Sequence, residues 1–278
     1  MLARMRERGL GATVACTVMV LAYLFPVYWM VATSLKPQKD VFAVPPKIVP
    51  WPPTFASYEK AVIGNDLVAH SLLNSAIIGI GTTLVTLVLA VPAAYGLARL
   101  KLRFTVAFAL FLLISQMLPS INLALPLFVL FSKAGLVNSY QGLIVANATV
   151  TVPFAIIVLR PFFLTVPGEV IEASRVDGST RFGAFLRVAL PLSTPGLITV
   201  SALSFLMAWG DFVFGLTLAT KENMQPVTVT LSQIITEFGT RWNELMAVST
   251  VVALPIVLFF VFLQRYIVGG LTSGSLKE

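Results

Sequence analysis

The chain has 278 residues, of which 57% are hydrophobic and only 11% are charged, and its mean hydropathy is +0.90. Because soluble proteins average about 25% charged residues, this composition excludes an ordinary water-soluble domain and predicts a membrane protein. The net charge of +7 would suit either a nucleic-acid partner or cytoplasmic membrane loops, and the placement of the basic residues decides between them. The single cysteine, Cys16, and the single histidine, His70, exclude an internal disulfide and a metal site with two imidazoles, so we expect both to be structural.

Six apolar segments meet or approach the roughly 20 residues that a helix needs to cross a bilayer core. They predict membrane-spanning helices at about 10–33, 71–98, 104–131, 141–160, 196–218 and 246–267. The third segment contains Pro119 and Pro126 beside a polar patch, so we expect a break or kink there. The first segment follows three arginines and is longer than a typical signal peptide, which indicates an uncleaved anchor. The expected fold is an all-α membrane protein with six transmembrane helices in a single domain, 1–278.

The basic residues indicate the orientation. With the N-terminus inside, 12 of the 19 lysines and arginines fall on inside segments, and the short loop 99–103 alone carries three of them. Four of the seven outside residues lie in the long loop of about 34–70, which weighs less in the positive-inside rule. We therefore expect both termini in the cytoplasm and no nucleic-acid partner. The longest cytoplasmic loop is then 161–195.

This loop carries the signals of two short helices. Pro167 and Glu169 suit the first turn of one helix, and Asp177-Gly178 would end it, since glycine readily adopts the left-handed conformation. A second helix is expected to begin near Ser179 or Thr180.

The second helix has an apolar side at helical spacing, and Leu190-Pro191 is expected to stop it. The residues on that side are Phe182, Phe185, Leu186 and Ala189. Two helices of this kind could lie on the membrane surface or fill a groove on another protein, and spacing alone leaves both interpretations open.

The order of residues in the loop resembles the signature of binding-protein-dependent ABC importer permeases. That signature is close to E-A-A-x-x-D-G-A, followed further along by a hydrophobic residue and L-P-L-x-x-P. The chain has Glu172-Ala173-Ser174, Asp177-Gly178 and Leu190-Pro191-Leu192 in this order, with Pro195 in the last position. Serine replaces alanine at 174 and 179, which keeps a small side chain for close docking. By this resemblance the ATPase-coupling residues are Glu172, Ala173, Ser174, Arg175, Asp177 and Gly178, and their role is mechanical docking.

Three further stretches are similar to carbohydrate-uptake permeases of the maltose-transporter type, specifically the smaller permease subunit. Residues 74–99 begin with N-S and end with A-A-Y-G-L-A-R, 208–212 read A-W-G-D-F, and 270–277 read G-L-T-S-G-S-L-K. Glycine at 210 departs from the asparagine that is usual there. The resemblance implies the type I ABC importer permease fold. It also implies that the chain moves a sugar, or a related polyol or glycerophosphodiester, by alternating access.

The resemblance implies the partners as well. They are a second homologous permease, an ATPase dimer that binds ATP and Mg, and an extracytoplasmic substrate-binding protein, assembled in the inner membrane of a bacterium. The outer loop 221–243 would then approach the binding protein. The chain itself has no G-x-x-x-x-G-K-[ST] sequence, so it is not the ATPase, and we expect no cofactor or metal in it.

Two other classes of membrane protein fit the sequence less well. A secondary, ion-coupled transporter is the alternative, but it would need coupling-ion groups and often shows inverted repeats. An intramembrane hydrolase would need a motif such as H-E-x-x-H or G-x-S-x-G, and neither occurs, so we expect no catalytic residue.

Polar side chains inside the expected spans are candidates for the transport pathway. Asp211 lies in the fifth span, where an ionisable group costs about 2.5–3.5 kcal/mol. The amides of Asn74, Gln116 and Asn122 are weaker candidates. Each of the four could instead hold helices together through hydrogen bonds, and both interpretations stay open.

Overall fold

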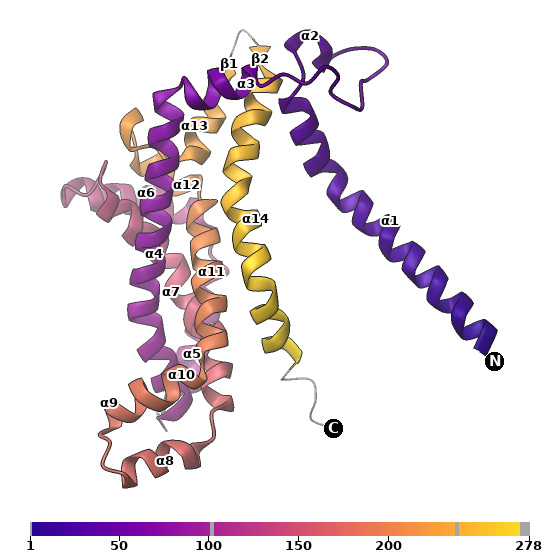
Figure 1. Cartoon of the computed structure of the whole chain (residues 1–278). Coiled ribbons are helices and arrows are strands. Elements are labelled where there is room, and N and C mark those ends of the chain that lie inside the picture. Colours follow the sequence, from indigo (N-terminus) through magenta and orange to yellow (C-terminus); the bar gives the residue numbers. More distant parts are fainter. Residues whose placement is uncertain (1, 101–102, 237–238, 273–278) are drawn as a thin grey trace. The chain divides into compact units, whose positions relative to one another are not determined.

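The computed structural model describes residues 2–100, 103–236 and 239–272, which are helical over most of their length (Figure 1). The long helices are α1 (Leu2–Ser34), α4 (Asp66–Arg99), α7 (Tyr140–Thr165) and α14 (Trp242–Thr272). Shorter ones are α5 (Thr105–Ser115), α6 (Ser120–Lys133), α8 (Gly168–Val176), α11 (Thr194–Trp209), α12 (Val213–Leu218) and α13 (Val227–Gln233). The smallest elements are α2 (Gln38–Val41), α3 (Ala56–Tyr58), η1 (Glu59–Ile63), α9 (Arg181–Ala184), η2 (Phe185–Ala189), α10 (Leu190–Leu192) and η3 (Glu222–Met224). The strands β1 (Ile235–Thr236) and β2 (Gly239–Thr240) pair antiparallel, with Ile235 opposite Thr240.

Four helical stretches are long and apolar enough to cross a membrane. They are Gly11–Ser34, Asp66–Arg99, Tyr140–Thr165 and Trp242–Val261. Two further candidates are helix pairs bent at a short break: α5 with α6, at 93°, and the run Arg181–Leu192 with α11, at 77°. The described residues therefore hold four to six candidate spans, and the predicted all-α membrane fold is confirmed.

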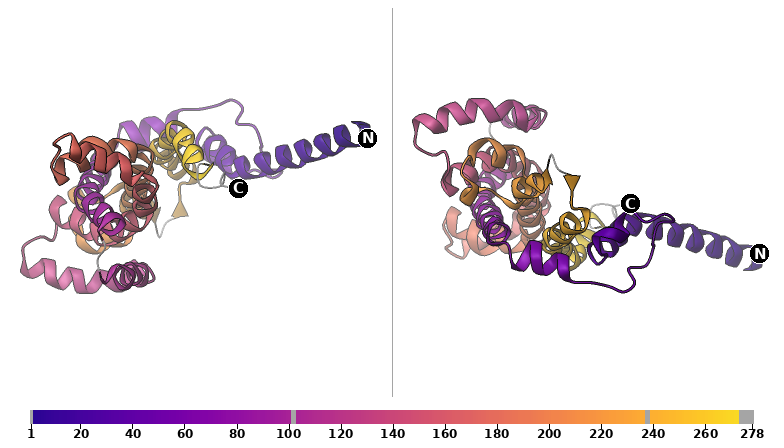
Figure 2. Two further views of the ribbon diagram at one scale, coloured as in Figure 1. Left: turned by 90° about the horizontal axis from the view of Figure 1, so that it is seen from below. Right: turned by 90° about the horizontal axis from the view of Figure 1, so that it is seen from above.

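Two of the expected spans are interrupted. The break expected in the third span is found, because α5 ends at Ser115 and α6 begins at Ser120 in a new direction (Figure 2). Pro119 cannot donate a backbone hydrogen bond and stands directly before α6, which explains the position of the break. The fifth span, expected as one helix over 196–218, differs from the expectation because α11 ends at Trp209 and α12 begins only at Val213.

Contacts divide the chain into two compact units, 1–69 with 231–254, and 70–230 with 255–278. The prediction of a single domain therefore stays a prediction, and each unit is described by itself.

In the first unit, the loop after α1 is held by side chains that pair at short range. The Ser34 hydroxyl lies 2.7 Å from the Tyr58 hydroxyl, and the Lys60 ammonium forms a 3.0 Å salt bridge with Glu244. Lys36 is buried, with its ammonium 4.2 Å from the centre of the Trp29 ring. Burial lowers the pKa of Lys36 below its ordinary value, and the nearby charge of Asp40 opposes this shift. These contacts give the loop after α1 a defined structure.

The core of the second unit lies among α4, α7 and α11 and is rich in small residues. Ala90 and Ala94 of α4 and Ala155 of α7 are fully buried in one hydrophobic cluster. A Cβ added at Gly196 of α11 would lie only 2.5 Å from the Phe162 ring. Small residues allow the close backbone approach that stabilises helix pairs in a membrane. A hydrogen bond of 2.6 Å between the Thr86 and Thr151 hydroxyls adds a polar link between α4 and α7.

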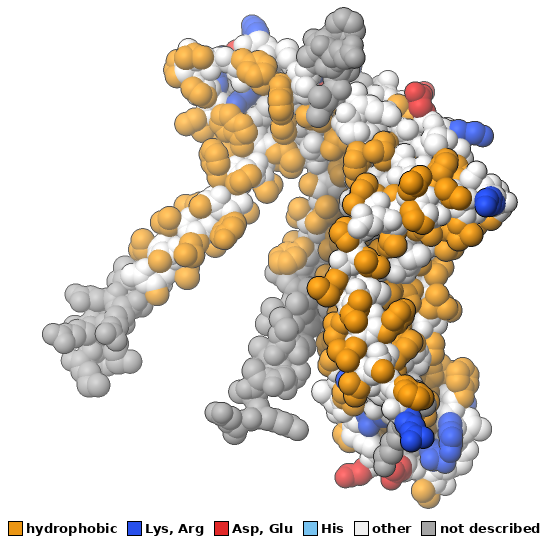
Figure 3. Space-filling view, turned by 180° about the vertical axis from the view of Figure 1, so that it is seen from behind, with side chains coloured by type: hydrophobic (Ala, Val, Ile, Leu, Met, Phe, Trp, Pro, Cys, Tyr) orange, Lys and Arg blue, Asp and Glu red, His pale blue; other side chains and the backbone are white. Residues whose placement is uncertain are grey.

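Hydrophobic side chains cover most of the face shown in Figure 3, while charged side chains gather toward the ends of the long helices. Exposed apolar residues include Leu84 and Val88 on α4 and Leu110 and Phe111 on α5. A surface of this kind suits a lipid environment, in which apolar side chains face outward.

Candidate functional site

The helix α8 is defined at both ends by its sequence. Pro167 precedes it, and Glu169 lies in its first turn, where a negative charge complements the positive end of the helix dipole. At its other end, Gly178 has a φ of +91°. The backbone N–H of Gly178 donates to the Arg175 carbonyl at 3.1 Å, and that of Ser179 donates to the Ser174 carbonyl at 3.0 Å. This is the hydrogen-bond pattern of a Schellman motif, so the predicted glycine stop is confirmed.

The second helix of the segment is a continuous run, Arg181–Leu192, composed of α9, η2 and α10. It begins as predicted, because the Thr180 side chain accepts a hydrogen bond of 3.0 Å from the Gly183 N–H. The run continues to Leu192 instead of stopping at Leu190-Pro191. Directly before Pro191 the helix widens, since the Leu190 N–H reaches back five residues to the Phe185 carbonyl. A widened turn of this kind accommodates the proline ring without ending the helix.

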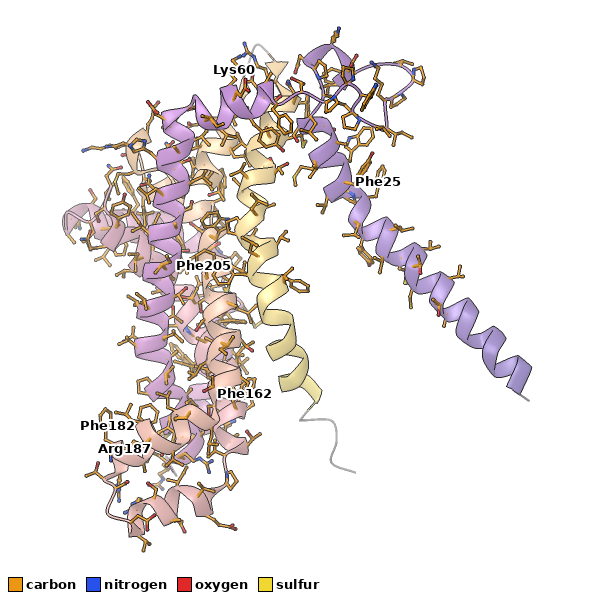
Figure 4. All side chains as sticks on the ribbon, viewed as in Figure 1. Phe25, Lys60, Phe162, Phe182, Arg187 and Phe205 are labelled. Carbon is orange, nitrogen blue, oxygen red and sulfur yellow. The ribbon has the colours of Figure 1, made fainter. Side chains whose placement is uncertain are left out.

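The predicted apolar side of this run is partly buried. Phe185 and Ala189 are buried, whereas Phe182 is 67% exposed and Leu186 is 43% exposed (Figure 4 labels Phe182). Three of the four residues share a side as predicted, because Phe182, Phe185 and Leu186 line one pocket beside α4.

The two sides of α8 have different surroundings. Residues at helical spacing line a groove of about 380 Å³, together with the end of α4 and the start of the second run. The groove residues on α8 are Gly168, Ile171, Glu172 and Arg175. Ala173 and Val176 lie outside the groove and are both exposed, Val176 to 88%. Val176 was not a predicted site residue, although its position two residues before the glycine stop could have indicated it.

The charged residues of α8 have no internal partner among the residues that the structure describes. No salt bridge is formed there by Glu169, Glu172, Arg175 or Asp177, and all four are exposed. Ser174 is half-buried and contributes its carbonyl to the turn. The predicted coupling residues therefore lie together on one short exposed helix and its terminal turn.

The groove is closed on its other side by Tyr95 and Arg99 of α4, with Arg181 and Ala184 of the second run completing it. The guanidinium of Arg99 donates a hydrogen bond to the carbonyl of Val166, the residue that follows α7. Arg99 contributed to the predicted orientation and to the resemblance over 74–99, but it was not a predicted site residue. Its place in the last turn of a long helix, beside a tyrosine, was the signal that could have indicated a contact with the loop.

Asn74, a predicted pathway residue, is buried and fully hydrogen-bonded. Its amide nitrogen donates to the carbonyls of Asn223 and Gln225, both at 3.0 Å. Its oxygen accepts a hydrogen bond of 2.7 Å from the Tyr140 hydroxyl. The neighbouring Ser75 accepts from the Val227 N–H at 2.9 Å. These bonds hold the segment 223–227 in place. They explain why Asn74 is buried without any contact between Asn74 and the substrate.

Asp211 lies in the break between α11 and α12. One carboxylate oxygen accepts from the Gly215 N–H at 3.0 Å, and the other lies 3.4 Å from the Phe214 nitrogen. The side chain thereby satisfies N–H groups that a helix leaves unpaired at its first turn. Its backbone carbonyl accepts a hydrogen bond from the Thr228 hydroxyl. Asp211 therefore caps α12 through its side chain and links to α13 through its backbone carbonyl. A role of Asp211 in the transport pathway stays a prediction.

The other two pathway candidates differ in exposure. The Gln116 side chain lies at the α5–α6 break and donates to the Val150 carbonyl of α7 at 3.0 Å. Asn122, in the first turn of α6, is exposed. The four candidates occupy separate places in the fold, so the structure does not assemble them into one cluster.

Sequence reasoning missed Asn138, which holds the start of the outer segment. It has a φ of +58°, a conformation that asparagine adopts more readily than most residues. Its amide nitrogen donates to Thr220 at 2.8 Å, and its oxygen accepts from the Lys221 N–H at 2.9 Å. Ser139 caps α7 by accepting a hydrogen bond from the Gly142 N–H. The dipeptide Asn138-Ser139 directly before a helix was therefore the sequence signal for a structured turn at Asn138.

The fold and the site together define a multi-span helical membrane protein whose helix α8 is exposed and ends in a glycine turn. The chain matches the family described as "Binding-protein-dependent transport system inner membrane component" over residues 86–273. It is 37% identical over 259 residues to the trehalose transport system permease protein SugB of Mycobacterium tuberculosis, covering 91% of this chain and 92% of that protein. It is 33% identical over 264 residues to the diacetylchitobiose uptake system permease protein DasC of Streptomyces coelicolor, covering 95% of each.

A solved structure shares the fold. A chain of a bacterial ABC transporter involved in the import of alginate superimposes with a TM-score of 0.80 at 20% identity, over 94% of this chain and 96% of that one. The chain therefore belongs to the family of binding-protein-dependent transport system inner membrane components. It is a multi-pass permease subunit of an ABC importer of the bacterial inner membrane, and the ATPase is a separate chain. The alternative of an ion-coupled secondary transporter is excluded by this assignment.

Proposed function

We propose that the chain moves a carbohydrate into the cell by alternating access, powered through α8. The relatives support the substrate class, since their names specify trehalose, diacetylchitobiose and, in Bacillus subtilis, arabinooligosaccharides. The substrate class is tested with the reconstituted transporter and its binding protein. A mono-, di- or oligosaccharide should stimulate ATP hydrolysis, and stimulation only by a non-carbohydrate would contradict the proposal.

The proposal that α8 couples transport to ATP hydrolysis rests on one observation. Apart from Ser174, the signature residues on α8 are exposed, and its charged side chains form no salt bridge within the described residues. Glu172, Ala173 and Asp177 are exposed, and the turn at Gly178 ends the helix abruptly, so a second protein can surround it on more than one side. Val176 adds an apolar side chain to that surface. Apolar surface next to unpaired charge is typical of a partner interface. We place the ATPase there, with Arg175 and Ser174 completing the contact surface.

The remaining partners follow from the same proposal. A second, homologous permease would supply the other half of the pathway, and both termini would lie in the cytoplasm. The outer segment 221–243 would contact the binding protein. The hydrogen bonds from Asn138 and Asn74 support this last assignment, because they hold the start of that segment in a defined conformation.

Reversing the charge of Glu172 tests the ATPase contact. Glu172→Lys should reduce the amount of ATPase that copurifies with the permease and should abolish ATP-dependent uptake, with the permease inserted in the membrane at normal levels. Glu222→Lys is the matched control, since Glu222 is an equally exposed acid on η3 in the outer segment. The control should keep its ATPase. Normal ATPase recovery and uptake in Glu172→Lys would contradict the proposal.

A further inference from the structure

Two arginines connect the end of α4 to the end of α7, one extending from each helix to a backbone carbonyl at the end of the other. Arg99, in the last turn of α4, donates to the Val166 carbonyl just after α7. Arg160, in α7, reaches back to the Leu97 carbonyl of α4, with its Nε 3.4 Å away. Hydrogen bonds from charged donors are roughly twice as strong as neutral ones. The ends of α4 and α7 are therefore linked to each other directly before the chain enters α8.

An aromatic cluster connects the ends of α4 and α7 to the helical run Arg181–Leu192, which together with α8 forms the coupling segment, 168–192. The Tyr95 ring of α4 lies 4.7 Å from the Phe185 ring and 5.5 Å from the Phe163 ring of α7, measured between centroids. Phe163 and Phe185 are both buried. Aromatic pairs at these separations stabilise the contact beyond the burial of the rings alone. Tyr95 thus lies between a membrane helix and the coupling segment, in contact with both.

The groove described above gives the same residues a second contact with α8. Tyr95 and Arg99 line one wall, and Ile171, Glu172 and Arg175 line the other. Of the groove residues on α8, Ile171 is half-buried and packs against the core, whereas Glu172 and Arg175 are exposed at the rim of the groove. A partner can therefore hold Glu172, Arg175 and the exposed Ala173 and Val176 while Ile171 stays against the core beside α4.

From these contacts we propose that Arg99, Arg160 and Tyr95 form the joint that passes the movement of α8 to α4 and α7. The joint rests on the proposed function, in that it requires α8 to be moved by the ATPase. Its residues are positioning residues, which touch neither the ATPase nor the substrate. A displacement of α8 pulls on Val166 and, through the second run, on Phe185. Both attachments lead to the last turns of α4, so the long helices tilt together instead of the loop bending alone.

The test compares Arg99→Ala with Arg103→Ala in the complete transporter. Arg103 is the matched control because it carries the same charge four residues further along and is exposed. Arg99→Ala should bind the ATPase and hydrolyse ATP at the basal rate, while substrate uptake per ATP hydrolysed falls by about tenfold, which corresponds to about 1.4 kcal/mol. Arg99→Lys keeps a charged donor and should fall between Arg99→Ala and the unmodified protein. Arg103→Ala should couple normally.

A distance measurement separates a loose joint from a merely unstable protein. Spin labels at Val88→Cys on α4 and Val170→Cys on α8, both exposed positions, are introduced with Cys16→Ser. The distance distribution should be narrow in the unmodified joint and broad with Arg99→Ala. Tyr95→Leu removes the ring contacts without touching the arginines and should broaden it as well, which gives a second variant if Arg99→Ala is not recovered from the membrane.

Two results would overturn the joint. One is normal uptake per ATP in Arg99→Ala and Tyr95→Leu, and the other is an equal loss in Arg103→Ala. A failure of the proposed function is recognised independently, because Glu172→Lys would then keep its ATPase whatever the Arg99 variants do.

Discussion

The coupling segment and the outer segment use polar residues in opposite ways. On α8, Glu172 and Asp177 are exposed and form no salt bridge within the described parts of the chain. Beside the outer segment, the amides of Asn74 and Asn138 and the carboxylate of Asp211 each form a hydrogen bond with a backbone group. Buried polar groups need internal partners, whereas exposed ones keep their hydrogen-bonding capacity for another molecule. The comparison teaches which polar residues maintain the fold and which are available for assembly.

The largest expected effect comes from breaking an internal anchor. Asn74→Leu has nearly the same volume but leaves the Asn223 and Gln225 carbonyls and the Tyr140 hydroxyl without their partner. An unsatisfied buried polar group costs about 1–3 kcal/mol, so we expect a loss of about 3 kcal/mol or more in the free energy of unfolding. Thermal unfolding of the purified permease in detergent measures it.

Asn122→Leu is the matched control for this change, since Asn122 is an exposed amide on α6. It should leave the unfolding temperature nearly unchanged. ATPase recovery should be normal in both variants, because the two regions are expected to act separately. A stable Asn74→Leu protein would show that the outer segment has another anchor.

The ends of α8 could be predicted from the sequence, but the roles of Asn74 and Asp211 could not. The ends of α8 were predictable because proline, an acidic first turn and glycine each have a local effect on the backbone. The roles of Asn74 and Asp211 were not, because an amide or acid in an apolar segment has the same local pattern whether it binds a neighbouring helix or lines a pathway. Tertiary contacts decide between these, and two of the three partners of Asn74 lie 149 and 151 positions further along the chain.

The interruptions of the helices were partly predictable. Pro119 indicated the break between α5 and α6, since proline acts on its own backbone. The break after Trp209 was missed because hydropathy stays high through Phe212–Leu218, and only the Asp211 cap distinguishes the second helix. The widened turn before Pro191 was missed because helical spacing assumes a regular turn.

An intermediate effect is expected where the coupling segment depends on backbone conformation. Gly178→Ala adds one methyl group in open space, but at a φ of +91°, where other residues are strained by roughly 1–2 kcal/mol. The last turn of α8 should loosen, and ATPase recovery and uptake should both fall about tenfold, with little change in thermal stability. Gly168→Ala adds the same group in equally open space at the other end of α8, without a positive φ, and should be nearly neutral. Equal effects of the two substitutions would contradict a role for the turn.

The smallest effect is expected at Asp211, where the outer segment can keep its cap without a charge. Asp211→Asn keeps one acceptor oxygen for the Gly215 N–H and loses only the 3.4 Å contact with the Phe214 nitrogen, so it should change the free energy of unfolding by less than about 0.5 kcal/mol. Asp211→Ala removes both oxygens and should cost about 1 kcal/mol. If the residue acts only as a cap, the loss of uptake should follow the loss of stability in both variants. A large loss of uptake in Asp211→Asn at nearly unchanged stability would instead assign the negative charge to the pathway.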